Sequence, residues 1–360
     1  KGNRGLQVGG GIDTRIFNTT IRDVSQNALH LRNGASNTIV YKSTFSHSSY
    51  GIYIELGHYP AKIIDCSIHN NTNDGIKSEG YGSIIRDNII VDNSGWGIWL
   101  HGRSTDDPDS IVTNNTLLRN VLGGIFLYRQ DANLYSNTIQ DNNYGIYIDH
   151  SVGIYLWNNT VTSNDEYDIK LTTSSDPNYA IGTSFSTISV DSSSSLIIKS
   201  YIDLDANDAS GDNMSGIDIK VIEDDVQKYA TSYFGGSDPK TDTYGTITTF
   251  LINSKKYEGS STAEIIPTYV TARSHDWVET TSFDSSSTIQ ITVPDLRVQN
   301  TRTGTLTYHI QTSLDASVSG DTIHAWAGIY YENLVITEEI TLKGNGTSTI
   351  INGTYTNNGI

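Results

Sequence analysis

The segment NLYSNTIQDNNYGIYIDH (residues 133–150) decides the fold, because variants of it recur from Ile16 to Leu171. Apolar residues alternate within each copy, as in Ile146 and Ile148, which is the spacing of a strand. A unit of this size cannot bury its own apolar side, so the copies are expected to stack as the coils of a right-handed parallel β-helix. The Gly-Ile step or its equivalent marks seven copies, one every 23 residues or so: Ala28-Leu29, Gly51-Ile52, Gly75-Ile76, Gly97-Ile98, Gly124-Ile125, Gly145-Ile146 and Asp168-Ile169.

Two columns of asparagine keep the same period. Asparagine tolerates the left-handed backbone of a tight turn, and stacked amides can hydrogen-bond to the coils above and below. The columns therefore predict polar ladders at the corners of the coils and apolar ladders along the flat sides. The first column holds Ser43, Cys66, Asn88, Asn115, Asn137 and Asn159, and the second holds Asn71, Asn93, Asn120, Asn142 and Asn164.

This pattern resembles the parallel β-helix repeat of NosD-like and pectate-lyase-like proteins, and especially of long archaeal and bacterial surface-layer, sheath and adhesin proteins. The resemblance covers nearly half of the chain and implies a β-helix over residues 1–175. Lyases, epimerases, adhesins and inert stalks share this architecture, so the resemblance implies a fold rather than an activity.

A different pattern follows Leu171, where the period stops. About seven short strands, separated by turns rich in Gly, Asp and Pro, are expected between Phe185 and Val293. Strands at this regular spacing predict an immunoglobulin-like (Ig-like) β-sandwich over residues 176–294. The run from Asp208 to Val221 also resembles Ig-like modules of surface proteins.

The last part of the chain, residues 295–360, is expected to form a capping helix and the first coils of a further β-helix. Leu306, Ile310 and Leu314 share one face of a short helix. The stretch from Gly320 to Gly346 resembles the opening of a NosD-like β-helix. Both ends of the chain read as incomplete coils, which predicts one period of a longer tandem protein or copies that continue one another head to tail.

The composition indicates an extracellular or cell-surface protein. Forty acidic and 23 basic side chains give a net charge of −17, which argues against a nucleic-acid partner and an anionic membrane. No apolar run has the length of a membrane span. Seven Asn-x-Ser/Thr sequons are glycosylation candidates, namely Asn18, Asn70, Asn114, Asn158, Asn213, Asn345 and Asn352.

A stripe of aromatic residues is expected along one flank of the β-helix. The residue between the two apolar positions of each Gly-Ile-x-apolar strand should point outward, and in four coils it is Tyr53, Trp99, Phe126 or Tyr147. Three interpretations stay open. The rings stack on one another as cross-strand pairs, they contact a neighbouring domain or subunit, or they form a platform for sugar rings.

One acidic run, Asp203, Asp205, Asn207 and Asp208, is a candidate calcium site. It does not match an EF-hand, whose sixth and twelfth positions are Gly and Glu, because those positions are Asp208 and Met214. An irregular calcium loop and a solvated turn both stay open. No histidine pattern predicts a zinc site.

The run Tyr147–His150 resembles the WIDH signature of pectate lyases, which implies calcium-binding carboxylates and an arginine base on one face. Only Asp131 and Arg129, one coil earlier, are expected near it, so no complete catalytic set is predicted. The sequence therefore favours a structural or adhesive surface protein, a component of a filament, sheath or S-layer and not an enzyme. The alternative is a protein that binds or degrades a polysaccharide through the aromatic stripe.

Overall fold

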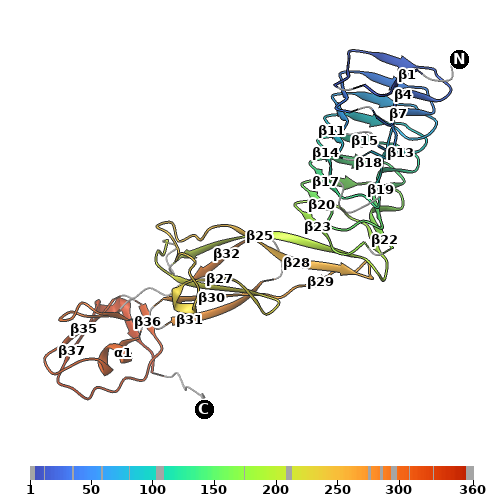
Figure 1. Ribbon diagram of the computed structural model, residues 1–360. Coiled ribbons are helices and arrows are strands. Elements are labelled where there is room, and N and C mark those ends of the chain that lie inside the picture. Colours follow the sequence, from blue (N-terminus) through green and yellow to red (C-terminus); the bar gives the residue numbers. More distant parts are fainter. Residues whose placement is uncertain are drawn as a thin grey trace. The chain divides into compact units, whose positions relative to one another are not determined.

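The computed structural model describes residues 5–353 except 12, 35, 58–59, 81, 103–108, 174, 208–212, 275–276, 284–286, 293–297, 308 and 327. The chain forms two compact units, one of Lys1–Ser200 with Asn253–Ile266 and one of Tyr201–Ile252 with Pro267–Ile360. Almost all regular structure in the described residues is strand, which confirms the predicted all-β class (Figure 1). No helix in this described part has the length and apolarity that a membrane crossing requires.

The first unit is a parallel β-helix, as predicted. The coils from β2 to β22 add one strand to each of three sheets, so that Ile76 pairs in register with Ile52 of the coil before and Ile98 of the coil after. The first sheet has nine strands, β1 (Leu6–Val8), β4 (Asn27–Leu31), β7 (Tyr50–Ile54), β10 (Ile76–Ser78), β13 (Trp96–His101), β16 (Gly123–Tyr128), β19 (Tyr144–Asp149), β22 (Tyr167–Thr172) and β24 (Ile188–Val190).

The other two sheets complete the coils. The second runs through β2 (Arg15–Phe17), β5 (Ile39–Tyr41), β8 (Lys62–Ile64), β11 (Ile84–Arg86), β14 (Ser110–Thr113), β17 (Ala132–Tyr135), β20 (Tyr155–Trp157), β23 (Asn178–Ile181), β25 (Ser195–Asn207), β28 (Phe250–Glu258) and β29 (Glu264–Ile265), with β32 (Ser287–Thr292) beside β25. The third contains β3 (Thr20–Arg22), β6 (Thr44–Ser46), β9 (Ser67–His69), β12 (Ile89–Val91), β15 (Thr116–Leu118), β18 (Thr138–Gln140) and β21 (Thr160–Thr162).

Stacked aliphatic side chains fill the interior. Ile52, Ile76, Ile98, Ile125 and Ile146 lie above one another and are each 0% exposed. Burying one such side chain contributes about 1.5–3 kcal/mol relative to leaving it in water. A single coil could not achieve this burial, so the stability of the β-helix depends on contacts between neighbouring coils.

The two asparagine columns are buried ladders, but the left-handed backbone belongs to the residue before each ladder position. Positive φ values occur at Asp87 (60°) and Asn114 (55°), whereas Asn88 and Asn115 are each 1% exposed and point inward. The turn residue directs its side chain to solvent, so the next side chain meets the backbone of the neighbouring coils. The polar ladders are therefore confirmed, and the left-handed turn that asparagine tolerates lies one residue before each ladder position.

Coil stacking continues beyond the expected limit at residue 175. Ile169 of β22 pairs in parallel with Ile188 of β24, and Asn178 of β23 pairs with Leu196 of β25. These coils lack the Gly-Ile step of the earlier repeats, which is why the periodic pattern ends at Leu171 while the stacking does not.

The second unit contains two further cores. One lies among β25, β26, β28 and β30 and includes Leu204, Val221 and Val270. Its antiparallel sheet consists of β27 (Val226–Ala230), β26 (Asp218–Glu223), β30 (Thr268–Ser274) and β31 (Trp277–Phe283), and η1 (Ser232–Phe234) follows β27.

The other core surrounds Ile310 and Ile323. The predicted helix is present there as α1 (Ile310–Asp315), but it is shorter than expected, because Leu306 lies in a strand and not on the helix. Two parallel pairs, β35 with β37 and β36 with β38, have the pairing of stacked coils. The elements are β33 (Val298–Asn300), β34 (Leu306–Thr307), β35 (Thr322–Ala325), β36 (Gly328–Tyr330), β37 (Thr341–Gly344), η2 (Gly346–Ser348) and β38 (Thr349–Ile351).

Candidate functional site

The outer surface of the first sheet carries the candidate site, here called the aromatic face. Tyr53, Trp99, Phe126 and Tyr147 lie in one row along it, with Lys77 between Tyr53 and Trp99. All four aromatic side chains are half-buried, since the strand alternation turns the flanking apolar residues inward. Their role in ligand binding stays a prediction.

Neighbouring rings and ammonium groups of this row contact one another. The ring centroids of Trp99 and Phe126 are 6.2 Å apart, and those of Phe126 and Tyr147 are 5.1 Å apart. Nζ of Lys77 lies 3.9 Å from the centroid of the Trp99 ring, and Nζ of Lys170 lies 4.8 Å from that of Tyr147. Cross-strand stacking is thus part of the aromatic face, and it holds the rings in fixed positions.

A second row runs parallel to the first and is less regular. Successive coils place Tyr50, Asp74, Trp96, Gly123 and Tyr144 at the residue before the Gly-Ile step or its equivalent. A Cβ atom at position 123 would overlap the indole of Trp96, so glycine is required for Trp96 to lean across that coil. There the indole stacks on Phe126, with centroids 5.0 Å apart and planes 22° apart, and faces Tyr144 at 6.2 Å.

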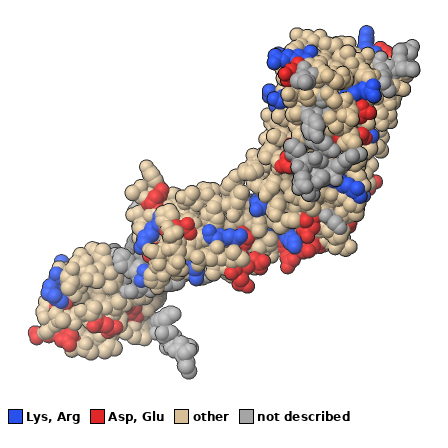
Figure 2. All heavy atoms as spheres, in the orientation of Figure 1, with Lys and Arg blue, Asp and Glu red and all other residues tan. Residues whose placement is uncertain are grey.

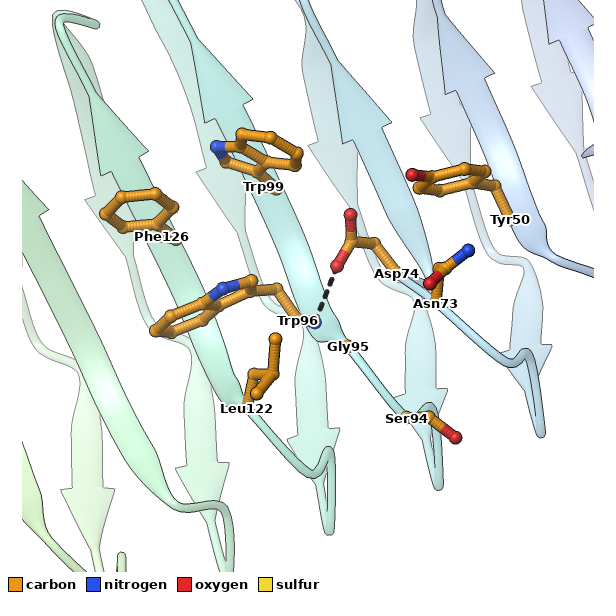
Figure 3. Close-up of a pocket in the computed structure, with 9 residues that line it drawn as sticks. All are labelled: Tyr50, Asn73, Asp74, Ser94, Gly95, Trp96, Trp99, Leu122 and Phe126. Atoms are coloured by element: carbon orange, nitrogen blue, oxygen red, sulfur yellow. Dashed lines mark hydrogen bonds between the residues drawn. The ribbon is translucent and has the colours of Figure 1, made fainter.

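A pocket of about 380 Å³ opens beside these rings and is here called the Asp74 pocket. Figure 3 shows the carboxylate of Asp74 between the ring of Tyr50 and the indoles of Trp96 and Trp99. The residues that line it are Tyr50, Asn73, Asp74, Ser94, Gly95, Trp96, Trp99, Leu122 and Phe126.

Asp74 is the polar centre of the pocket and is only 5% exposed. Its Oδ1 accepts a hydrogen bond of 2.7 Å from the backbone N–H of Trp96, and no described residue donates to its Oδ2. Burial raises the pKa of Asp74 to about 6, although the Trp96 N–H and the charge of Lys77 act in the opposite direction. Lys77 is itself paired with Glu79, with Nζ and Oε1 3.1 Å apart.

Sequence analysis did not identify Asp74 as a site residue. The signal that could have found it is a carboxylate in a column where the neighbouring coils carry Tyr50 and Trp96. Its burial could not be predicted, because it depends on how the two large rings cover the short side chain between them.

The residues of the pectate-lyase-like run do not converge on a cavity. Nδ1 of His150 lies 2.9 Å from Oδ1 of Asp149, which also accepts a hydrogen bond of 3.1 Å from Oγ1 of Thr172. The guanidinium of Arg129 lies over the ring of Tyr128, 5.2 Å from its centroid. Arg129, the arginine expected near Asp149, thus contacts an aromatic ring of its own strand end.

The calcium prediction is not supported. Asp203, Asp205 and Asn207 lie in strand β25 rather than in a loop, and Asp203 accepts a hydrogen bond from Thr249. A strand turns successive side chains to opposite faces and keeps alternate ones several ångströms apart, which does not suit a cation shell. Asp208 lies outside the described residues. In the described part of the chain, no group of three or more His, Cys, Asp or Glu side chains could hold a metal ion.

The sequon asparagines lie at the surface, but their glycosylation stays a prediction. Asn18, Asn70, Asn114 and Asn158 are exposed left-handed turn residues of the β-helix. Asn213 and Asn345 are also exposed, and Asn352 is half-buried.

The β-helix is similar to several solved structures, and the chain spans about half the length of each. The A-modules of the mannuronan C-5 epimerases AlgE4 and AlgE6 of Azotobacter vinelandii are both 15% identical to it, with TM-scores of 0.42 and 0.40. The alignments cover 52% of this chain in both cases and 56% and 55% of those chains. The catalytic domain of Agl-KA is 14% identical with a TM-score of 0.41, over 54% of this chain and 45% of that one.

A comparison with curated protein sequences finds no match. A family match is nevertheless present over the β-helix, whose repeat was the most regular pattern in the sequence. Residues 2–191, more than half of the 360-residue chain, match the family described as "Periplasmic copper-binding protein (NosD)", and the chain belongs to this family.

Proposed function

We propose that this chain is a polysaccharide-binding β-helix protein that acts outside the cytoplasm, with its ligand along the aromatic face. The observation that carries the proposal is the Asp74 pocket, where half-buried rings surround a hydrogen-bond acceptor that lacks a donor. Sugar rings stack their C–H faces on aromatic side chains and donate their hydroxyl groups to such acceptors. The name of the family describes a periplasmic protein, which supports the location.

The charge of the protein favours a polysaccharide that is not itself anionic. The net charge is −17, and Glu55, Asp74 and Glu79 lie on or beside the aromatic face. Figure 2 shows basic side chains scattered among acidic and uncharged ones over the visible side of the β-helix. The net negative charge of the protein would repel a uronate polymer, whereas it would not repel a neutral or a cationic polysaccharide.

Copper, which the family description names, does not fit the described residues. The centroids of the His47 and His69 rings are 5.9 Å apart, but these rings belong to no group of three or more possible ligands. Cys66 is 3% exposed, and burial raises the pKa of its thiol, which disfavours the thiolate that a copper ion would need. No role of copper therefore enters the proposal.

The proposal predicts that the aromatic face binds glycans through its rings. A glycan array of neutral, amino and acidic oligosaccharides, followed by calorimetry with the strongest ligand, should detect binding to the wild-type chain. Trp99→Ala should weaken that binding roughly five- to thirtyfold, because stacking on one aromatic ring contributes about 1–2 kcal/mol. Trp157→Ala is the matched control, because Trp157 is a half-buried ring on the second sheet, away from the pocket. The proposal would be refuted if the wild-type chain bound no glycan on the array. It would also be refuted if the wild type, Trp99→Ala and Trp157→Ala bound the ligand with equal affinity.

A second candidate function is assembly with like chains, favoured by exposed apolar side chains of the second unit. Val335, Ile336, Ile350 and Ile351 are 63%, 51%, 48% and 44% exposed, although comparable residues inside the first β-helix are covered by the next coil. A coil of a second copy is the occupant we propose, since like coils present matching strand edges. The head-to-tail joint expected from the sequence links residues 356–360 to residues 1–8, and of these 356–360 and 1–4 lie outside the described residues.

Sedimentation velocity tests the assembly. The wild-type chain should associate as its concentration rises, and the double variant Ile350→Lys with Ile351→Lys should remain monomeric. Val226→Lys, which changes an apolar residue that is 55% exposed elsewhere, should associate like the wild type. A monomeric wild type, or a double variant that associates equally well, would contradict this second candidate.

A further inference from the structure

The coil that contains β10 interrupts both rows of the aromatic face. In the first row it places Lys77 between Tyr53 and Trp99, and in the second row it places Asp74 between Tyr50 and Trp96. Both interruptions put a charged side chain where the coils on either side carry a ring. The two positions differ in how that charge is compensated.

In the first row the interrupting charge is a cation that lies between rings. Nζ of Lys77 is 3.9 Å from the centroid of Trp99 and 5.5 Å from that of Tyr53. Lys170, further along the face, repeats this arrangement at 4.9 Å from Tyr144 and 4.8 Å from Tyr147. An ammonium group thus lies over aromatic rings at two places on this face.

In the second row the side chain at this position is an anion, and Nζ of Lys77 lies 5.8 Å from the centroid of the Tyr50 ring without lining the pocket. Tyr50 and Trp96 are two coils apart, roughly 10 Å, and the indole of Trp96 leans away over Gly123. Oδ1 of Asp74 is bound to the Trp96 N–H, while the other oxygen points into the space between Trp99 and Tyr50 (Figure 3). A buried carboxylate with a single donor is costly unless a partner compensates its charge.

The charged groups that face this space leave it negative. Lys77 is paired with Glu79, whose Oε2 also accepts a hydrogen bond of 2.9 Å from the Tyr53 hydroxyl. Asp74, Lys77 and Glu79 together carry one net negative charge, and the nearby hydroxyl of Tyr50 is neutral, since its pKa is raised above the ordinary value by burial. One lysine thus faces two carboxylates, and a bound cation would balance the remaining negative charge.

We infer that the Asp74 pocket binds the protonated amino group of an amino-sugar unit, an inference that rests on the proposed glycan-binding function. The ammonium group would donate to Oδ2 of Asp74 from within the pocket, whose lining does not include Lys77. The sugar ring would stack against Trp96. A hydroxyl group at the same place could donate one hydrogen bond but could not balance the charge of the carboxylate.

The test compares two ligands that differ only in this group. Calorimetry near neutral pH with a β-1,4-linked glucosamine hexamer and with cellohexaose should show at least tenfold tighter binding of the glucosamine hexamer to the wild-type chain. Asp74→Asn should lose this preference and bind both hexamers equally, because asparagine keeps the shape and the acceptor but not the charge. Asp65→Asn is the matched control, since Asp65 is an exposed turn residue whose left-handed φ of 52° asparagine tolerates. It should keep the preference.

The acidity of Asp74 adds a readout that general charge attraction would not move. Wild-type affinity for the glucosamine hexamer should rise as the pH increases from about 5 towards 6.5, because Asp74 ionises around pH 6 and the amine is still largely protonated. Asp74→Asn should lack this rise. Equal wild-type affinities for the two hexamers, or a preference retained in Asp74→Asn, would overturn the inference and leave the proposed function standing. Binding of neither hexamer together with an empty glycan array would refute the proposed function itself.

Discussion

Replacing Asn115 with leucine should lower the free energy of unfolding by roughly 4 kcal/mol, the largest effect that we expect from one substitution in the β-helix. Asn115 is 1% exposed, and its Nδ2 donates to the carbonyl of Ile85 at 2.9 Å and to Oδ1 of Asn137 at 3.0 Å. Its Oδ1 accepts from the backbone N–H of Asn88 at 3.0 Å and from the Asn88 side chain at 2.9 Å.

The cost arises because leucine has the same branching as asparagine but offers no hydrogen-bond partner to these groups. A buried donor or acceptor without a partner costs about 1–3 kcal/mol, and this substitution leaves at least two backbone groups in that state. The loss should appear as a lower midpoint in urea denaturation followed by circular dichroism. Because a repeat protein can open locally, hydrogen exchange should also increase in the coils on either side of β15.

Asn114→Asp provides the control for the ladder. Asn114 is the exposed turn residue beside Asn115, and aspartate also tolerates its φ of 55°. The free energy of unfolding of the Asn114→Asp variant should stay within about 0.5 kcal/mol of the wild-type value. If the two substitutions proved equally mild, the amide ladder would contribute little, and the aliphatic interior alone would hold the coils together.

The features that repeat with the coil period could be predicted from the sequence. The apolar ladder that contains Ile98 and Ile146, the inward asparagine columns and the outward row of Trp99 and Phe126 all follow from strand alternation and a constant period. Periodicity fixes which face a residue occupies, because any shift of one residue would place apolar side chains in water.

The features that depend on a single coil could not be predicted in this way. The coils that contain β23 and β24 continue the stack without the Gly-Ile step, so the β-helix extends beyond the end that the sequence period predicts. The Asp74 pocket exists because Trp96 leans over Gly123, and this depends on the packing of rings from three coils. The position of the left-handed turn within each coil could not be predicted either, because asparagine suits both an αL turn and a buried amide ladder.

Asp74→Asn should have the opposite effect to Asn115→Leu and should stabilise the protein near neutral pH. The folded pKa of Asp74 is raised to about 6 from the ordinary value of 3.8, so the folded state holds its proton more tightly than the unfolded state. Below the ordinary value both states are protonated, and the group costs nothing. As the pH rises through the interval between these values the unfolded state ionises first, so stability falls by roughly 3 kcal/mol and stays low above it.

Asparagine removes the ionisation and keeps an oxygen for the Trp96 N–H, so the variant should escape this loss. Urea denaturation should show a gain of about 2 kcal/mol over the wild type near pH 7.5 and almost none near pH 4. Asp65→Asn, at an exposed position, should match the wild type at both pH values. A variant that is destabilised equally at both would mean that the carboxylate serves the fold. A gain confined to neutral pH, together with a lost preference for the glucosamine hexamer, would mean that the protein keeps a costly buried charge for its ligand.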